Sequence, residues 1–385
     1  MNARGAQAQA GVLDAIERVD RLVADLREPE LDVLLVATPV NVRYLTGFTG
    51  SNALLLIAAD APAGGLDGPG FHRFLTDFRY ATQSADQVPD VFAREIVHDK
   101  LLDAVAQALE DAEGDAGRLG FDDAGLTVAQ HAHLREQLPD AWELVPCGGM
   151  VERLRAIKDP GEIARIHAAA ELADEALGHI LERGLAGRTE RDVAIDLELA
   201  MRRLGAEPSF PSIVASGAHG ALPHAEARAE RIARDVLVTI DWGALHDGYC
   251  SDCTRTYATG EGISARAREV YELVRSAQAQ GLAAVRAGPS GVELDAVVRE
   301  IIEEAGYGER FGHGLGHGVG MEVHEGPRLS RTAGDDPLLE GNVVTVEPGV
   351  YLPGECGVRI EDLLVVRADG HEVLTGLPKE LTVIS

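Results

Sequence analysis

Residues 236–252 read Val-Leu-Val-Thr-Ile-Asp-Trp-Gly-Ala-Leu-His-Asp-Gly-Tyr-Cys-Ser-Asp, and they predict a β-hairpin that carries two carboxylates. An apolar run ends at Asp241, and a turn signal at residues 246–248 precedes a return strand that contains Asp252. If the turn centres on 246 and 247, the two Asp residues are directly opposed; if it centres on 247 and 248, they are diagonal neighbours on one face. Either register predicts two close carboxylates, whose repulsion would be costly without a cation between them.

The organisation around this hairpin occurs twice along the chain. A predicted helix opens at Gly187-Arg188-Thr189 and closes at Gly205, and a helix of equal length opens at Gly288-Pro289-Ser290 and closes at Gly306. Each follows a longer predicted helix and precedes two strand-like runs. We therefore expect a duplicated helix-helix-strand-strand unit, with sheets that face one another inside a helical cover. The strand-like runs are residues 235–241 and 249–257 in the first half and residues 342–347 and 357–366 in the second.

The second half of the repeat supplies two further acids. Glu347 follows an apolar run, Glu361 lies within the next one, and they are the repeat counterparts of Asp241 and Asp252. The duplication would therefore bring four acids toward one pseudo-two-fold centre. A single acid at such a position is usually a solvated strand residue, but four at repeat-related positions indicate a site.

A glycine-rich loop with three histidines occupies residues 311–325, Phe-Gly-His-Gly-Leu-Gly-His-Gly-Val-Gly-Met-Glu-Val-His-Glu. Glycine lets the backbone approach a centre closely, and histidine offers ligand and proton-transfer groups near neutral pH. The glycines do not complete a GxGxxG pattern, and no strand leads into a helix here, so nucleotide binding is not predicted. Three histidines beside paired acids favour a functional site over isolated structural histidines.

Four carboxylates and one imidazole make an oxygen-rich ligand set. Such a set suits a pair of manganese, cobalt or zinc ions better than it suits a structural zinc site with thiolate ligands. Two bridging carboxylates would hold the ions ~3.5–4 Å apart, and a shared water would become a hydroxide nucleophile. The pattern therefore predicts a hydrolytic two-metal centre.

The part of the chain before residue 146 alternates helical and strand signals and has few residues suited to catalysis. We expect an α/β domain over residues 1–147, with a linker at Pro146-Cys147-Gly148-Gly149. Residues 42–51 have the turn-rich composition of a loop. The other predicted elements are a helix near 13–27, strands at 31–37 and 53–58, and a Pro/Gly-rich connection at 61–70.

A second domain over residues 151–385 is predicted to begin with a long helix. Asp159-Pro160-Gly161-Glu162 has Asp as N-cap, Pro in the first turn and Glu three positions after the cap. The apolar residues after this start share one helical face as far as Gly184. Two domains also agree with a length of 385 residues, of which 45% are hydrophobic and 25% charged.

Charge and composition argue against several classes of partner. A net charge of -28 would repel phosphate backbones, so we expect no nucleic-acid partner. Residues 1–20 contain no apolar signal segment, and the apolar runs have strand length, so we expect a cytoplasmic protein without a membrane span. The Cys250-x-x-Cys253 spacing also occurs in zinc and redox sites, but a zinc knuckle needs a second ligand pair. We therefore expect reduced thiols at Cys147, Cys250, Cys253 and Cys356.

Five separated motifs of the second domain occur in an order and local context typical of one family. They are Ile240-Asp241-Trp242-Gly243, Ser251-Asp252, the loop His313–His324, Val346-Glu347-Pro348-Gly349 and Arg359-Ile360-Glu361-Asp362. This set resembles the methionine aminopeptidase/prolidase/creatinase superfamily over residues 151–385. In the first domain, residues 44–51 and 76–80 are similar to aminopeptidases P and small bacterial Xaa-Pro dipeptidases.

The resemblance implies an α+β fold with a pita-bread catalytic domain and an internal pseudo-two-fold repeat. A smaller α/β domain of the creatinase/prolidase N-terminal type would precede it, support oligomerisation and restrict substrate length. The resemblance also implies two divalent metal ions, with Mn²⁺ expected and Co²⁺ or Zn²⁺ as alternatives. The implied ligands are Asp241, Asp252, His317, Glu347 and Glu361.

The same resemblance assigns catalytic roles around the metal pair. Glu347 would take the proton of the attacking water. His313 and His324 would stabilise the tetrahedral intermediate and position the peptide, and His224 would contact the substrate. Arg359 would orient the metal ligand on its strand face or the carboxyl end of the substrate, or would serve as a plain ion-pair partner.

The function implied is an Xaa-Pro aminopeptidase of the aminopeptidase P type, which acts on short proline-containing peptides as a homodimer or higher homo-oligomer. An Xaa-Pro dipeptidase, or prolidase, shares every catalytic residue named above and is the alternative; a metal-dependent lyase on the same fold is a further one. The first domain argues against a methionine aminopeptidase. The intact ligand set argues against a creatinase-like enzyme, which works without metal, and against a pure binding module.

Overall fold

The computed structural model describes residues 3–59, 72–110 and 117–385, with side chains from residue 14 onward. The chain divides into two compact units, Met1–Arg155 and Ala156–Ser385. The division falls at the end of α6 (Met150–Ala156), one helix beyond the expected linker. The Pro/Gly-rich connection expected at 61–70 lies outside the described residues.

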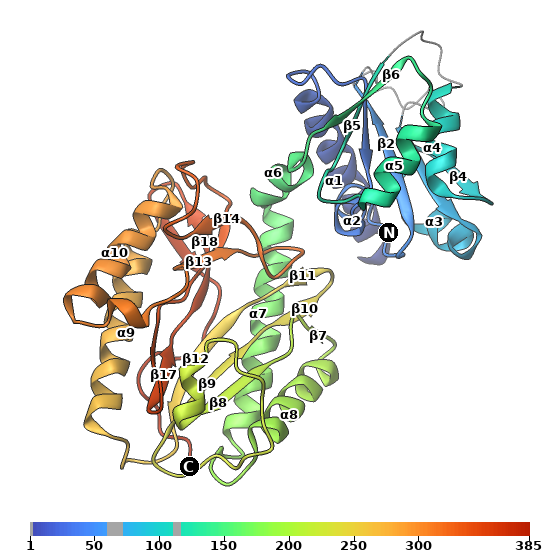
Figure 1. Cartoon of the computed structure of the whole chain (residues 1–385). Coiled ribbons are helices and arrows are strands. Elements are labelled where there is room, and N and C mark those ends of the chain that lie inside the picture. The colour runs from blue at the N-terminus through green and yellow to red at the C-terminus, as the bar shows by residue number, and fades with distance from the viewer. Residues whose placement is uncertain (1–2, 60–71, 111–116) are drawn as a thin grey trace. The chain divides into compact units, whose positions relative to one another are not determined.

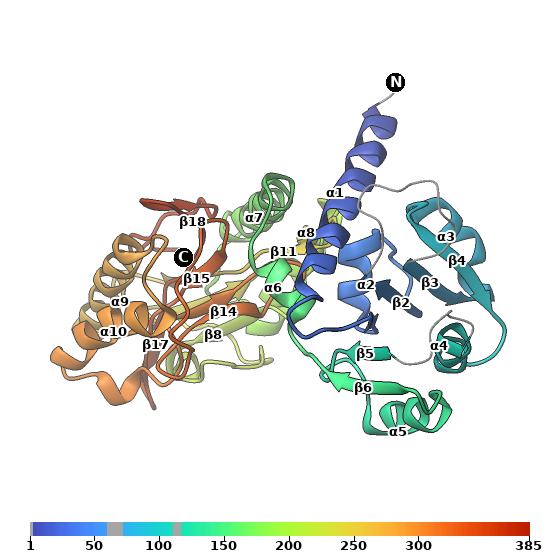
Figure 2. The same ribbon diagram turned by 90° about the horizontal axis from the view of Figure 1, so that it is seen from above.

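The first unit is built on a six-stranded mixed sheet with the strand order β4-β3-β2-β1-β5-β6. Its strands are β1 (Val33–Val36), β2 (Ala53–Ala58), β3 (His72–Asp77), β4 (Phe92–Val97), β5 (Gly117–Phe121) and β6 (Trp142–Pro146). Its helices are α1 (Ala3–Asp25), α2 (Pro39–Thr46), α3 (Ala81–Gln87), α4 (Leu101–Glu110) and α5 (Val128–Gln137). Leu35, Leu56 and Leu134 belong to the buried cluster beneath α4 and α5, and α1 and α2 cover the other face (Figure 2).

The prediction of a loop over residues 42–51 is wrong for the first half of that range, because α2 continues to Thr46. The helix ends at Gly47, which has a φ of 74° and donates its N–H to the carbonyl of Arg43. Tyr44 and Phe48 are buried, and the Phe48 ring lies 5.5 Å from the ring of Tyr80. Burial of these rings in the core outweighs the local turn signals.

Four long helices of the second unit carry polar N-caps. They are α7 (Pro160–Leu181), α8 (Glu190–Arg203), α9 (Ala265–Ala284) and α10 (Gly291–Glu304). Asp159, Thr189 and Ser290 cap α7, α8 and α10, and each side chain accepts the backbone N–H three positions later. α8 and α10 both have 14 residues, so the predicted pair of equal helices is confirmed.

The strands of the second unit lie between α7 and α8 on one side and α9 and α10 on the other (Figures 1 and 2). Their sheet orders are β12-β9-β8 and β11-β10-β7 in the first half, and β14-β13-β15-β18-β19 and β16-β17 in the second. The first half contains β7 (Glu207–Pro208), β8 (Ile213–Ser216), β9 (Leu237–Trp242), β10 (Ala244–His246), β11 (Tyr249–Cys250) and β12 (Cys253–Ala258). The second contains β13 (Gly316–Gly318), β14 (Glu325–Leu329), β15 (Val343–Val346), β16 (Gly349–Leu352), β17 (Cys356–Arg359), β18 (Asp362–Arg367) and β19 (Gly370–Val373).

The hairpin of residues 236–252 turns at Asp247 and Gly248, which have φ values of 48° and 86°. Asp241 in β9 pairs with Thr254 in β12. Asp252 precedes Thr254 by two residues, so the two Asp residues are diagonal neighbours, as the second of the two predicted registers requires.

The strands expected at 249–257 and 357–366 are each interrupted at an acid, so the prediction of continuous strands was wrong there. Ser251-Asp252 separates β11 from β12, and Ile360-Glu361 separates β17 from β18. At the second break, the N–H of Glu361 donates to the carbonyl of Thr254 in the other half at 3.0 Å. The backbone leaves its own ladder here because it bonds across the two halves.

The cysteines are free thiols, as predicted: Cys147 is partly exposed, and Cys250, Cys253 and Cys356 are buried. Among the described residues, no helix combines the length and the apolar character needed to cross a bilayer.

Candidate active site

One cavity of about 650 Å³ in the second unit is lined by all nine residues that the sequence singled out. Part of its remaining wall is apolar and includes Phe210, Ile213 and Val323. Both halves of the repeat contribute to it, so the structure brings the predicted residues together in one place. The nine are His224, Asp241, Asp252, His313, His317, His324, Glu347, Arg359 and Glu361.

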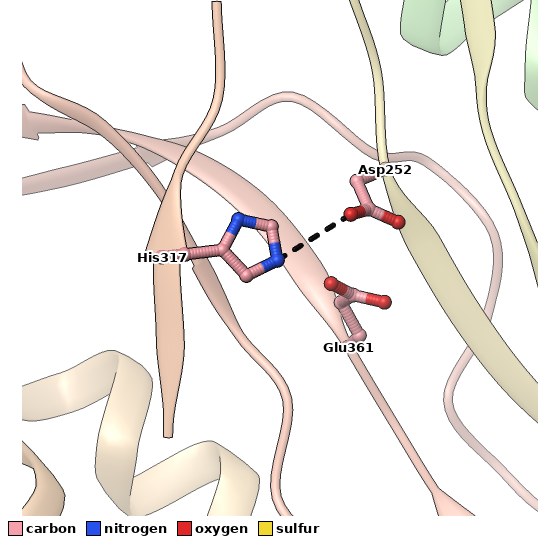
Figure 3. Close-up of side chains that lie close together, drawn as sticks. All are labelled: Asp252, His317 and Glu361. Atoms are coloured by element: carbon pink, nitrogen blue, oxygen red, sulfur yellow. Dashed lines mark ion pairs between the residues drawn. The ribbon is translucent and has the colours of Figure 1, made fainter. Parts of the chain in front are cut away.

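Asp252, His317 and Glu361 form the tightest group, since one donor atom of each lies within 4.8 Å of the others. Their side chains point toward one another from three separate segments (Figure 3). Nε2 of His317 lies 3.6 Å from Oδ2 of Asp252 and 3.3 Å from Oε1 of Glu347. Several carboxylate oxygens and one imidazole nitrogen therefore face the same small space.

The placement of His317 depends on glycines in its strand. A Cβ atom at Gly316 would lie 2.1 Å from the carbonyl oxygen of Thr345, and one at Gly318 would lie 2.1 Å from that of Gly326. The N–H of His317 donates to Oγ1 of Thr345 at 3.1 Å, and its ring Nδ1 lies 3.1 Å from the carbonyl of Gly318. Donation from Nδ1 to that carbonyl orients the ring so that Nε2 faces the carboxylates.

The buried carboxylates cannot all be ionised without a counter-charge. Burial and the charges of Glu361 and Asp241 raise the pKa of Asp252 well above its usual range. Burial and the charge of Glu347 do the same to the pKa of Glu361. Burial also acts on Glu347, but a hydrogen bond from His317 and nearby positive charge bring its pKa below the usual range.

The donor set fits a divalent cation. Oδ1 of Asp241 is buried and has no hydrogen-bond partner within the described part of the chain. A buried carboxylate oxygen without a donor costs free energy unless a cation contacts it. Four acids with one imidazole suit manganese, cobalt or zinc.

Arg359 contacts one of these acids directly and a second one through Thr254. Its Nη2 donates to Oδ2 of Asp241 at 2.6 Å, which makes it an ion-pair partner. Its Nε donates to Oγ1 of Thr254 at 3.0 Å, and that hydroxyl donates to Oε2 of Glu361 at 2.7 Å. Arg359 therefore orients Glu361 through Thr254.

Thr254 and Tyr351 belong to the site although the sequence analysis did not name them. The hydroxyl of Tyr351 accepts from Nη1 of Arg359 at 2.8 Å and lies 2.9 Å from Nε2 of His313. Side chains alternate along a strand, so Thr254 shares a face with Asp252, and this pattern could have identified it from the sequence. No comparable signal marks Tyr351, because the contact depends on how β16 packs on β17.

The three remaining histidines differ in their surroundings. Nδ1 of His313 lies 2.8 Å from the carbonyl of Gly314 and its Nε2 contacts Tyr351, so both ring nitrogens are engaged. His224 and His324 are exposed on the cavity wall. The ring of His324 lies 4.3 Å from the ring of His317. Exposure leaves His224 and His324 open to a molecule in the cavity, whereas His313 is held by protein groups.

Comparison with known proteins extends over both units. Residues 164–368 match Metallopeptidase family M24, and residues 18–157 match the Creatinase/Prolidase N-terminal domain. An Xaa-Pro dipeptidase of Pyrococcus furiosus is 37% identical over 372 residues, which cover 95% of this chain and 99% of that protein.

Two solved structures have the same fold over nearly their whole length. An Xaa-Pro dipeptidase from Bacillus anthracis superposes with a TM-score of 0.89 at 40% identity, covering 96% of this chain and 99% of its own. An X-Pro aminopeptidase from Thermotoga maritima superposes with a TM-score of 0.81 at 35% identity, covering 92% and 98%. Relatives with both names therefore share the fold.

Proposed function

The chain belongs to metallopeptidase family M24, and we propose from this premise that it is an Xaa-Pro dipeptidase, which hydrolyses the bond between an N-terminal residue and a following proline. Family membership confirms the superfamily resemblance and the predicted fold class. The observation that carries the proposal is one cavity that collects His317 and four acids, two of them buried and two partly buried, in a chain similar to Xaa-Pro dipeptidases.

Asp241, Asp252, His317, Glu347 and Glu361 would hold two divalent ions, with Mn²⁺ as the first candidate and Co²⁺ or Zn²⁺ as alternatives. When bound, such a pair supplies Lewis acidity and makes a water molecule a good nucleophile near neutral pH. The unpartnered Oδ1 of Asp241 supports this assignment.

The side chains around the ligands would carry the other tasks. Glu347 would accept a proton from water and pass it to the leaving proline nitrogen. His224 and His324 would contact the peptide, because they are exposed to the cavity. His313 has both ring nitrogens bonded, so we assign it to positioning through Tyr351 rather than to the substrate contact first expected.

The choice between dipeptidase and aminopeptidase depends on whether the substrate ends at the proline or continues beyond it. The sequence alone favoured aminopeptidase P through residues 44–51, but the names of the relatives support the dipeptidase alternative better. The X-Pro aminopeptidase from Thermotoga maritima keeps the other activity as a second candidate. Assembly into a homodimer, with residues 1–147 supporting it and limiting substrate length, remains a prediction that light scattering can test.

The decisive experiment compares hydrolysis rates of Ala-Pro, Ala-Pro-Ala and Ala-Ala by the Mn²⁺-loaded protein. We expect turnover of Ala-Pro, at least tenfold slower turnover of Ala-Pro-Ala, and none of Ala-Ala. Faster cleavage of the tripeptide would establish the aminopeptidase instead. Failure on both proline peptides would exclude Xaa-Pro hydrolysis and leave a lyase or another hydrolase on the same fold.

A further inference from the structure

A completely buried carboxylate, that of Glu190, opens α8 and holds both ends of the loop that carries His224. Oε1 of Glu190 accepts the backbone N–H of Ser216 at 2.8 Å and its hydroxyl at 2.7 Å. Oε2 lies 2.9 Å from Nδ1 of His219 and accepts the backbone N–H of Arg228 at 3.2 Å. One side chain therefore fixes residues 216 and 228, with His224 between them.

The loop 216–228 forms one wall of the cavity. Pro223, His224 and Ala227 are among its lining residues. The carbonyl of Pro223 also accepts from Nη1 of Arg359 at 3.2 Å. A shift of this loop would therefore move the wall and disturb a hydrogen bond to the arginine that orients the acids.

Helix α10 of the other half carries a matching anchor. Oδ1 of Asp295 in α10 accepts the N–H of Leu315 at 3.0 Å, and its carboxylate forms a bidentate ion pair with Arg299. Arg299 in turn donates to the carbonyls of Phe311 and His313, both at 2.8 Å. Both charged side chains are buried. The pair thus holds the backbone of the loop that carries His313.

The two anchors do not occupy equivalent positions, since Glu190 is the first residue of α8 and Asp295 the fifth residue of α10. They perform the same task nonetheless, because each fixes a histidine loop from the helix that covers its own half. We propose that Glu190 and the Asp295–Arg299 pair are positioning residues, which set the catalytic geometry of the His224 loop and the His313 loop without touching substrate.

Neutral amides test the idea because they keep size and change hydrogen bonding. In Glu190→Gln, one acceptor becomes an NH₂ donor that would face the donors of its partners, so the loop must move. A displacement of 1 Å at a catalytic group costs up to ~100-fold in rate. The same reasoning applies to Asp295→Asn and the N–H of Leu315.

The experiment measures amide hydrogen exchange over the whole chain and kcat/KM for Ala-Pro with Mn²⁺, and the kinetic part rests on the proposed function. We expect Glu190→Gln to speed exchange at least tenfold in residues 216–228 and not in residues 311–315, and Asp295→Asn to do the reverse. Each should lower kcat/KM about 10- to 100-fold with metal content unchanged. Asp196→Asn on α8, whose carboxylate pairs with Arg183 and Arg188, and Glu300→Gln on the exposed face of α10 are matched controls.

Equal acceleration of exchange across the second unit would show a purely structural role and overturn the proposal, as would folded variants with activity within threefold of the parent. If Asp295→Asn does not fold, Arg299→Lys keeps the charge but cannot bind both carbonyls, and it should loosen residues 311–315 alone. A parent protein without activity on Ala-Pro would contradict the proposed function, while the exchange data would still decide whether the anchors hold their loops.

Discussion

Arg359 and Asp241 face one another across the two halves of the repeat, with Nη2 of Arg359 donating to Oδ2 of Asp241 at 2.6 Å. The same guanidinium contacts Thr254 of the first half and Tyr351 of the second, so its hydrogen bonds include both halves. Its planar fork suits this arrangement, because Nε, Nη1 and Nη2 are separate atoms that reach separate partners, whereas the three donors of a Lys ammonium share one nitrogen.

Replacement of Arg359 by Lys should therefore lower kcat/KM for Ala-Pro about 10- to 100-fold, since charge-assisted hydrogen bonds worth ~1–3 kcal/mol are lost. Steady-state kinetics and metal analysis of the same samples would check this. Arg367→Lys, at an exposed ion pair with Glu372, is the control and should change little. Unchanged kinetics in Arg359→Lys would contradict an orienting role.

Tyr351→Phe removes one hydroxyl that contacts both His313 and Arg359. We expect a fall in kcat of about 3- to 10-fold and a loss of about 1 kcal/mol in the free energy of unfolding, because one buried network is left incomplete. Tyr307→Phe removes a surface hydroxyl 3.4 Å from Glu269 and serves as the comparison. Equal effects of the two substitutions would show that the Tyr351 contacts do not matter to turnover.

His317 and His324 should respond differently to substitution by Ala. Nε2 of His317 faces Asp252 and Glu347, so His317→Ala should lose bound metal together with activity. His324 is exposed at the cavity wall, so His324→Ala should keep its metal and lose turnover. Elemental analysis after gel filtration distinguishes the two. The opposite pattern would reverse our assignment of ligand and substrate contact.

Chelation should abolish activity, and addition of Mn²⁺ or Co²⁺ should restore it. The physical reason is that the five proposed ligand side chains line one cavity, and a bound metal pair would activate the attacking water. Up to two ions per chain are expected by metal analysis. Full hydrolysis of Ala-Pro by protein shown to contain no metal would rule out the proposed mechanism.

The stabilisation given by the metal should grow with pH. Burial and neighbouring acids raise the pKa values of Asp252 and Glu361 in the folded, metal-free protein. A carboxyl whose pKa is raised by folding binds more protons in the folded state, so the metal-free protein loses stability as pH rises through that pKa. Bound cations remove this penalty. The increase in Tm on adding Mn²⁺ should therefore be larger at pH 7.5 than at pH 5.5, and an equal increase at both would contradict this account.

The positions of the acids were predictable because they depend on local rules. Alternation along a hairpin puts Asp241 and Asp252 on one face whichever register forms. The break at Glu361 was not predictable, because it results from a hydrogen bond to Thr254, 107 positions earlier. Tyr351 was missed because its contacts depend on how β16 packs on β17. Local periodicity describes one strand at a time, whereas these contacts depend on how separate segments pack.

The length of the substrate could not be predicted from local sequence patterns either. Residues 44–51 were interpreted as a sign of aminopeptidase P, but Tyr44 ends up buried in α2 and Phe48 is buried against Tyr80, whereas Thr49 and Ser51 are exposed. The two buried rings report on the fold of that unit. The dipeptidase alternative is supported by the names of the relatives and not by this motif.

The four acids come in equal numbers from the two halves of the duplicated unit. Asp241 and Asp252 belong to the first half, and Glu347 and Glu361 belong to the second. Neither half therefore contains all of the proposed metal ligands. An excised half would lack two of the four acids whatever its fold. Metal bound by all four acids would cross-link the two halves. Each copy of the duplicated unit would then depend on the other for a complete metal site.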